Sequence, residues 1–113
     1  MSKMSLKEII IDCLGKVKSK DVLVFDMRGF SPFFDEMVIA TVDSLRQAAA
    51  GVDYIKEEAL KAGYSVRGTE GEETEWVLID LNDVIVSIFT KEERERVSLE
   101  KIYLDRPVER IEL

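Results

Sequence analysis

One stretch, residues 75–90 (EWVLIDLNDVIVSIFT), constrains the fold more than any other part of the chain. At its centre lie Asn82 and Asp83, residue types that tolerate the positive φ angles of a tight hairpin turn. Pairing outward from this turn predicts a β-hairpin whose side chains alternate between two faces. One face is wholly apolar and is expected to belong to the core: Leu81 opposite Val84, Ile79 opposite Val86 and Val77 opposite Ile88.

The opposite face of this hairpin is half polar. It is expected to pair Asp80 with Ile85, Leu78 with Ser87 and Trp76 with Phe89, and it carries the only tryptophan of the chain. A half-polar face with large aromatic side chains is typical of a surface that docks a partner. The alternative is that a helix covers this face and Trp76 belongs to the core, and periodicity alone does not choose between the two.

The rest of the chain alternates helical and extended patterns. Apolar spacing, with Ser5 and Ser44 as caps and Gly63 as a stop, predicts two amphipathic helices. A second capping-box pattern starts at Thr90, and Ser98 is placed to cap a further turn. The predicted helices cover residues 6–17, 44–62, 90–97 and 98–103, and the predicted strands outside the hairpin cover 21–27, 36–42 and, briefly, 64–67.

This order of elements predicts an α/β (α+β) fold with a mixed sheet of about five strands and helices packed against it. A chain of 113 residues suits one domain. We expect that domain to span residues 1–105, followed by a tail over 106–113 that forms an edge strand or is disordered. Between the long helix and the hairpin, residues 68–75 (GTEGEETE) are expected to form an exposed acidic loop, either simply solvated or docking onto a basic partner.

Charge and missing residue types narrow the range of functions. The net charge of −7 disfavours nucleic-acid binding, which needs clustered positive charge, and fits a basic protein partner better. The absence of histidine removes the usual general base and most zinc sites. The single cysteine, Cys13, lies on an apolar helix stripe and is expected to be a buried hydrophobe in a reducing, cytoplasmic setting. We expect neither a secretory signal nor a membrane span.

Carboxylates remain as candidates for chemistry. Asp26 and Asp35 flank the turn between two predicted strands, where they could bind a divalent cation. Asp26, Asp80 and Asp83 could hold Mg²⁺ in a nucleotidyltransferase-like enzyme. Aspartates are common at strand ends, however, and no Lys-rich or Gly-rich phosphate loop accompanies them. We therefore expect no metal and no cofactor.

Several segments taken together resemble the Iojap or ribosomal silencing factor family over about residues 5–103. The segments are DMRGFSPFFDEMVIATVDSLRQ, VRGTEGEETEWVLIDLNDVIVSIF and SLEKIY. Their most specific parts are Ser44-x-Arg46, Glu70-Gly71, Glu75-Trp76-Val77 and Asp80-x-x-Asp83-Val84. The chain departs from the usual family pattern at Glu36, Ser87, Arg96, Val97, Ser98 and Tyr103.

The resemblance implies a regulator of translation that is not an enzyme. Members of the family bind the fourteenth protein of the large ribosomal subunit and sterically prevent the small subunit from joining, notably when nutrients are short. It also implies a nucleotidyltransferase-like fold without the catalytic motif. The predicted partner-binding residues are Trp76 as anchor, Leu78, Asp80 and Phe89 around it, and Arg94 and Tyr103 from the following helical segment. The alternatives are the metal-dependent enzyme described above and a homodimer that buries the Trp76 face.

Overall fold

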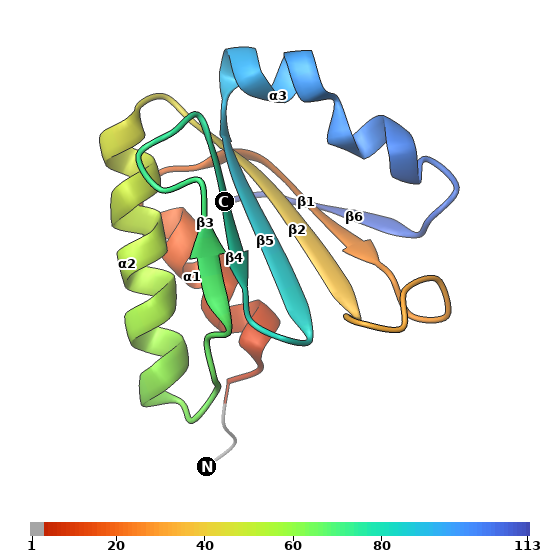
Figure 1. Ribbon diagram of the computed structural model, residues 1–113, viewed down its shortest axis with the longest axis horizontal. Helices are drawn as coiled ribbons and strands as arrows, with labels where there is room; N and C mark the ends of the chain where they lie inside the picture. Colours follow the sequence, from red (N-terminus) through yellow and green to blue (C-terminus); the bar gives the residue numbers. More distant parts are fainter. Residues whose placement is uncertain (1–3) are drawn as a thin grey trace.

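The computed structural model describes residues 4–113 as one mixed β-sheet with helices on both of its faces (Figure 1). The strand order across the sheet is β3-β4-β5-β2-β1-β6. Only β2 and β5 run parallel, and every other neighbouring pair is antiparallel. The elements in chain order are α1 (Leu6–Lys16), β1 (Lys20–Asp26), β2 (Glu36–Val42), α2 (Leu45–Lys61), β3 (Gly68–Glu70), β4 (Trp76–Asp80), β5 (Val84–Thr90), α3 (Lys91–Val97), the 3₁₀-helix η1 (Leu99–Tyr103) and β6 (Val108–Ile111).

The predicted hairpin is confirmed in register as well as in position. Strands β4 and β5 pair Trp76 with Phe89, Leu78 with Ser87 and Asp80 with Ile85, with the apolar pairs between them on the other face. At the turn, the amide of Leu81 donates to the carbonyl of Val84 at 3.0 Å, and Asn82 has φ +70°. The alternation of side chains was therefore sufficient to place this part of the sheet.

Helices α1 and α2 pack on the apolar face of the hairpin and form the main core. Ile10, Cys13 and Leu14 of α1 and Ile55 of α2 are fully buried there against the sheet. Gly51 of α2 faces Ile88 of β5: a Cβ at that position would lie 3.4 Å from Ile88 Cδ1, in ordinary van der Waals contact. The prediction that Cys13 is a buried hydrophobe is confirmed.

Local hydrogen bonds explain where the first two helices begin. The hydroxyl of Ser5 accepts from the amide of Glu8, and the hydroxyl of Ser44 accepts from the amide of Gln47. The side chain of Gln47 reaches back and accepts from the amide of Asp43 at 2.8 Å, close to the expected capping box. The capping box expected at Thr90 is wrong, because the Thr90 side chain makes no capping hydrogen bond and β5 runs directly into α3.

One predicted strand differs from the structure, and the tail takes one of its two expected forms. Residues 64–67 are not a strand. Pairing with β4 begins only where the amide of Arg67 donates to the carbonyl of Asp80, so the strand is β3, which takes up the first three residues of the predicted acidic loop. The tail forms an edge strand: β6 lies beyond the predicted boundary at residue 105 and pairs with β1, adding a sixth strand to the sheet.

Candidate functional site

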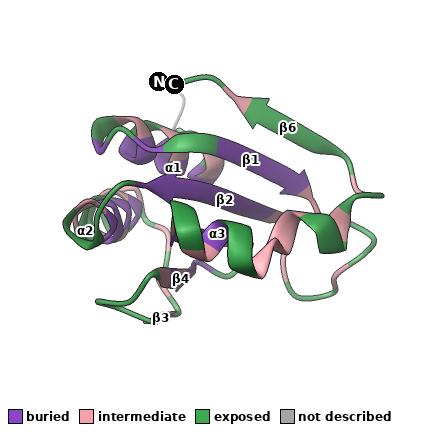
Figure 2. Ribbon diagram, turned by 90° about the horizontal axis from the view of Figure 1, so that it is seen from above, coloured by how far each residue is buried: buried purple, intermediate pink, exposed green. Residues whose placement is uncertain are grey.

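The second face of the sheet, opposite α1 and α2, is only partly covered. Helix α3 and the η1 segment after it fold back over this face (Figure 2). Phe25 of β1, Ile39 of β2 and Phe89 of β5 are buried there, in a cluster against which Val97 and Tyr103 pack. The parts of β4 and β5 next to the hairpin turn have no such cover. Three of their side chains on this face are only half buried: Leu78, Asp80 and Ile85. Helical cover is therefore present over one part of this face and absent from another.

Trp76 lies at the boundary between the covered and uncovered parts. Its indole stacks on the ring of Phe89, with centroids 5.0 Å apart, and it packs against the covered cluster while remaining half exposed. Phe89 itself is fully buried, so it packs against the inner face of the Trp76 ring and has no side-chain surface that a partner could contact. The predicted pair is present, but only Trp76 can meet a partner in this conformation.

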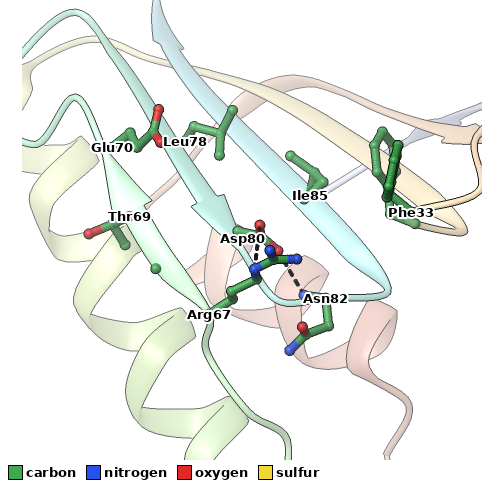
Figure 3. A pocket seen from close by; sticks show the side chains of 10 residues that line it. Phe33, Arg67, Thr69, Glu70, Leu78, Asp80, Asn82 and Ile85 are labelled. Carbon is green, nitrogen blue, oxygen red and sulfur yellow. Dashed lines mark hydrogen bonds and ion pairs between the residues drawn. The ribbon is translucent and has the colours of Figure 1, made fainter.

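A concavity of about 490 Å³ lies on the uncovered part, and Leu78, two residues along β4 from Trp76, lines it (Figure 3). Leu78 and Ile85 form its apolar floor, and Asp80 contributes a carboxylate that accepts from the Asn82 amide at 2.9 Å and lies 3.9 Å from Arg67 Nε. Phe33 lines the same concavity and is 81% exposed. We call the surface made by Phe33, Trp76, Leu78, Asp80 and Ile85 the open surface.

Phe33 and Ile85 are members of the open surface that the sequence analysis did not name among the site residues. Ile85 could have been found, because the predicted register already put it opposite Asp80 on the half-polar face. Phe33 could not, because its place depends on a contact distant in sequence: the amide of Asp35 donates to the carbonyl of Asp83 at 2.8 Å, which ties the loop after β1 to the hairpin turn.

The remaining predicted site residues lie away from the open surface. Arg94 is the buried residue of α3, and its guanidinium donates to Thr41 Oγ1 at 2.7 Å and to the carbonyl of Asp21. Tyr103 contacts the rings of Phe25 on β1 and of Phe30. Strand β2 separates β1 from β5, so Tyr103 and Trp76 do not share one patch. Ser87, one of the departures from the family pattern, is also buried.

Two of the carboxylates considered for chemistry, Asp26 and Asp80, are engaged in other contacts. Asp26 accepts two side-chain hydrogen bonds from Arg28, at 3.0 and 2.8 Å, which hold the pKa of that carboxyl well below its usual range. Across residues 4–113, no three His, Cys, Asp or Glu side chains lie together in a way that could hold a metal ion. Within the same range, no helix is both long and apolar enough to cross a membrane.

Acidic side chains flank the open surface. Glu70 lies opposite Leu78 in the β3–β4 register and lines the concavity. Glu72, Glu73 and Glu75 follow on the exposed connection that leads into Trp76. The segment turns at Gly71, where φ is +74° and a Cβ would lie 2.2 Å from the Trp76 carbonyl oxygen. An aromatic anchor, an apolar floor and a rim of carboxylates together suit a partner with apolar and cationic side chains.

Comparison with known proteins gives one consistent family. A family model described as "Ribosomal silencing factor during starvation" matches residues 2–113. The ribosomal silencing factor RsfS of Haemophilus influenzae is 39% identical over 101 residues, covering 88% of this chain and 99% of that protein. RsfS of Bacillus subtilis is 36% identical over 109 residues, covering 96% and 92% respectively.

Solved structures agree with this result. A crystal structure of a protein from Chromobacterium violaceum superposes with a TM-score of 0.84 at 31% identity, covering 91% of this chain and 87% of that one. A crystal structure of a protein from Bacillus halodurans gives a TM-score of 0.80 at 33% identity, covering 96% and 97%. The predicted α+β fold is confirmed by both.

Proposed function

The chain belongs to the ribosomal silencing factor family, and we propose that it binds the large ribosomal subunit through the open surface and prevents the small subunit from joining. Membership in the family makes it a ribosome-associated factor that represses translation, with no enzymatic activity. The metal-dependent enzyme considered from the sequence is therefore set aside.

The partner we propose is the fourteenth protein of the large subunit, which the family resemblance implies. Charge supports a ribosomal protein as partner: this chain carries −7, whereas ribosomal proteins are generally basic because they bind RNA. The four exposed glutamates between residues 70 and 75 directly precede Trp76 in the chain. The carboxylates that would attract a basic partner therefore lie close to the indole ring that would bind it. We propose that repression is steric: a folded domain bound at the subunit interface occupies space that the small subunit needs.

The observation that carries this proposal is the open surface itself. It combines a half-buried tryptophan, stacked on a phenylalanine, with a concavity whose floor is apolar, on a part of the sheet's second face that no helix covers. Binding hot spots are enriched in such tryptophans, surrounded by contacts that exclude water.

Co-sedimentation with isolated large and small ribosomal subunits tests the proposal. We expect the wild-type protein to pellet with large subunits only, and Leu78→Asp to abolish pelleting, because it places a charge on the apolar floor of the concavity. The matched control is Leu60→Asp, which makes the same change at an exposed leucine of α2, on the opposite face of the sheet.

Two results would reject the proposal. Equal pelleting of the wild-type protein with both subunits, or with neither, would remove the large subunit as the target. Unchanged pelleting of Leu78→Asp would leave the large subunit as the target but move the docking site away from the open surface.

A further inference from the structure

We propose that Arg94 is a positioning residue: it holds α3 and η1 against the sheet and thereby sets the shape of the Trp76 end of the open surface. The inference rests on the proposed function for its effect on ribosome binding. Arg94 itself does not touch the open surface, so its influence would pass through the residues that α3 and η1 press onto β5.

Arg94 is an unusual residue in this fold. At 8% exposure it is the only charged side chain among residues 4–113 that is buried. Burying a guanidinium is unfavourable unless its charge and its N–H groups find partners. Arg94 finds them on three separate elements, because it donates to the Asp21 carbonyl in β1, to Thr41 Oγ1 in β2 and to Glu100 Oε1 in η1.

The Asp21 carbonyl is available to Arg94 because of a local irregularity in the sheet. The β1–β2 register shifts between Lys20 and Leu23, and Asp21 adopts φ +50°, a conformation that few residue types tolerate as well as aspartate. A carbonyl at such a bulge has lost its ladder partner and needs another donor. The guanidinium, with five N–H groups in a planar fork, bonds this carbonyl and the nearby Thr41 hydroxyl with a single nitrogen.

The third partner connects Arg94 to the segment that follows α3. Glu100 Oε1 lies 3.4 Å from Arg94 Nε, while its Oε2 is buried and has no hydrogen-bond partner in the described part of the chain. Arg94 thus supplies the positive charge that contacts the Glu100 carboxylate. Because Ser98 turns the chain between α3 and η1 in a left-handed conformation, the Arg94–Glu100 pair closes this turn and fixes η1 relative to α3.

Fixing α3 and η1 has a direct consequence for Trp76. Val97 at the end of α3 and Leu99 at the start of η1 pack into the same cluster as Phe89 and Trp76. Phe89 is the residue on which the indole stacks, and α3 begins immediately after β5 ends at Thr90. A shift of α3 away from β1 and β2 would therefore loosen the cover of Phe89 and change the orientation of the Trp76 ring.

The test compares Arg94→Met with Arg46→Met, the same change at an exposed arginine of α2 on the other face of the sheet. Two quantities are measured at a temperature where circular dichroism shows each variant fully folded: affinity for large subunits, and acrylamide quenching of the fluorescence of Trp76, the only tryptophan. We expect Arg94→Met to weaken binding at least tenfold and to raise the quenching constant about twofold, with no change for Arg46→Met.

Two further variants keep the inference testable if Arg94→Met does not fold. Thr41→Val removes one acceptor at nearly constant volume, and Glu100→Gln removes the charge of the η1 partner; each is expected to shift both readouts in the same direction by a smaller factor. In a Trp76→Ala background, Arg94→Met is expected to cost less than twofold in further affinity, because its effect passes through Trp76.

The inference is overturned if folded Arg94→Met, or both substitute variants, bind within twofold of wild type and leave quenching unchanged. An undiminished tenfold cost in the Trp76→Ala background would equally overturn it, since Arg94 would then act independently of Trp76. If the wild-type protein binds no subunit, the proposed function fails, and the quenching measurement alone decides whether Arg94 positions Trp76.

Discussion

The indole ring of Trp76 stacks on the phenyl ring of Phe89, with centroids 5.0 Å apart and ring planes 26° apart. The two residues are direct partners in the β4–β5 register, and Phe89 is fully buried beneath α3 and η1. The stack therefore joins the buried core to the edge of the open surface. An aromatic side chain held in this way loses little conformational freedom when a partner docks on it.

Replacing Trp76 separates its roles in binding and in folding. We expect Trp76→Ala to weaken large-subunit binding by about 2 kcal/mol or more, the usual size for a hot spot. Because Trp76 is half buried, the free energy of unfolding should fall by less than the roughly 3–5 kcal/mol typical of a fully buried aromatic. Binding isotherms and urea denaturation measure the two effects. A variant that is unfolded in buffer would show that Trp76 belongs to the core, and Trp76→Phe is the control that keeps an aromatic ring.

Phe89 should show the opposite balance. We expect Phe89→Ala to lower the free energy of unfolding by about 3–5 kcal/mol, because it empties a fully buried site between the sheet and α3. Trp76 emission should move to longer wavelength as the indole loses its stacking partner. Urea denaturation monitored by tryptophan fluorescence records both changes. A loss of stability below about 1 kcal/mol would mean that α3 does not seal this part of the sheet.

Cys13 should be inert in the folded protein. Burial in the α1 core raises the pKa of its thiol to about 11, and only the thiolate reacts with disulfide reagents. At pH 8 we expect labelling by an aromatic disulfide reagent to be on the order of a hundredfold slower in buffer than in denaturant. Labelling at equal rates in the two conditions would show that α1 is not packed on the sheet.

The same shift predicts how Cys13 affects stability at alkaline pH. The folded state holds its thiol proton above the unfolded-state pKa of about 8.5, so the contribution of Cys13 to stability falls as pH rises from there towards 11. Cys13→Ala should remove this part of the pH dependence. Thermal denaturation between pH 7 and 10 on both proteins measures the difference, and parallel curves would contradict the prediction.

Asp26 should contribute to stability only when ionised. Its pKa is lowered in the folded protein, chiefly by the side-chain hydrogen bonds from Arg28. The contribution is then fully present above the unfolded-state pKa of about 3.9 and is lost as pH falls below that value towards the folded-state pKa. We expect Asp26→Asn to be less stable than wild type at pH 7 and the gap to close in acid. Because the pair is exposed, 1 M salt should also narrow the gap, whereas a gap that does not depend on pH would point to lost hydrogen bonding alone.

The parts of the structure that the sequence predicted well depend on contacts close in the chain. The alternation in residues 75–90 was enough to set every pair of the hairpin, because a slip by one residue would have turned Ile79 and Val86 towards solvent. Ser5, Ser44 and Gly63 likewise act on backbone groups within one turn of the helices that they delimit.

The parts that were missed depend on contacts distant in the chain. Tyr64 and Val66 alternate like a strand but pack on the core without sheet pairing, whereas Gly68 to Glu70 become β3 because β4 has a free edge beside them. Phe89 and Arg94 were expected on the partner surface, yet both are buried because α3 folds back over the sheet. Arg94 bonds to the irregularity of β1 at Asp21, which no local sequence pattern predicts. Side chains on one strand, Trp76, Leu78 and Asp80, could be assigned to one face, whereas the extent of helical cover over that face could not.

The most direct test of the central claim is light scattering during association of isolated subunits. Large subunits are first saturated with the protein, and small subunits are then added at a magnesium concentration that normally drives joining. We predict that the scattering increase is suppressed by the wild-type protein and by Leu60→Asp, and is restored to its full amplitude with Leu78→Asp. Full subunit association in the presence of saturating wild-type protein would contradict the account.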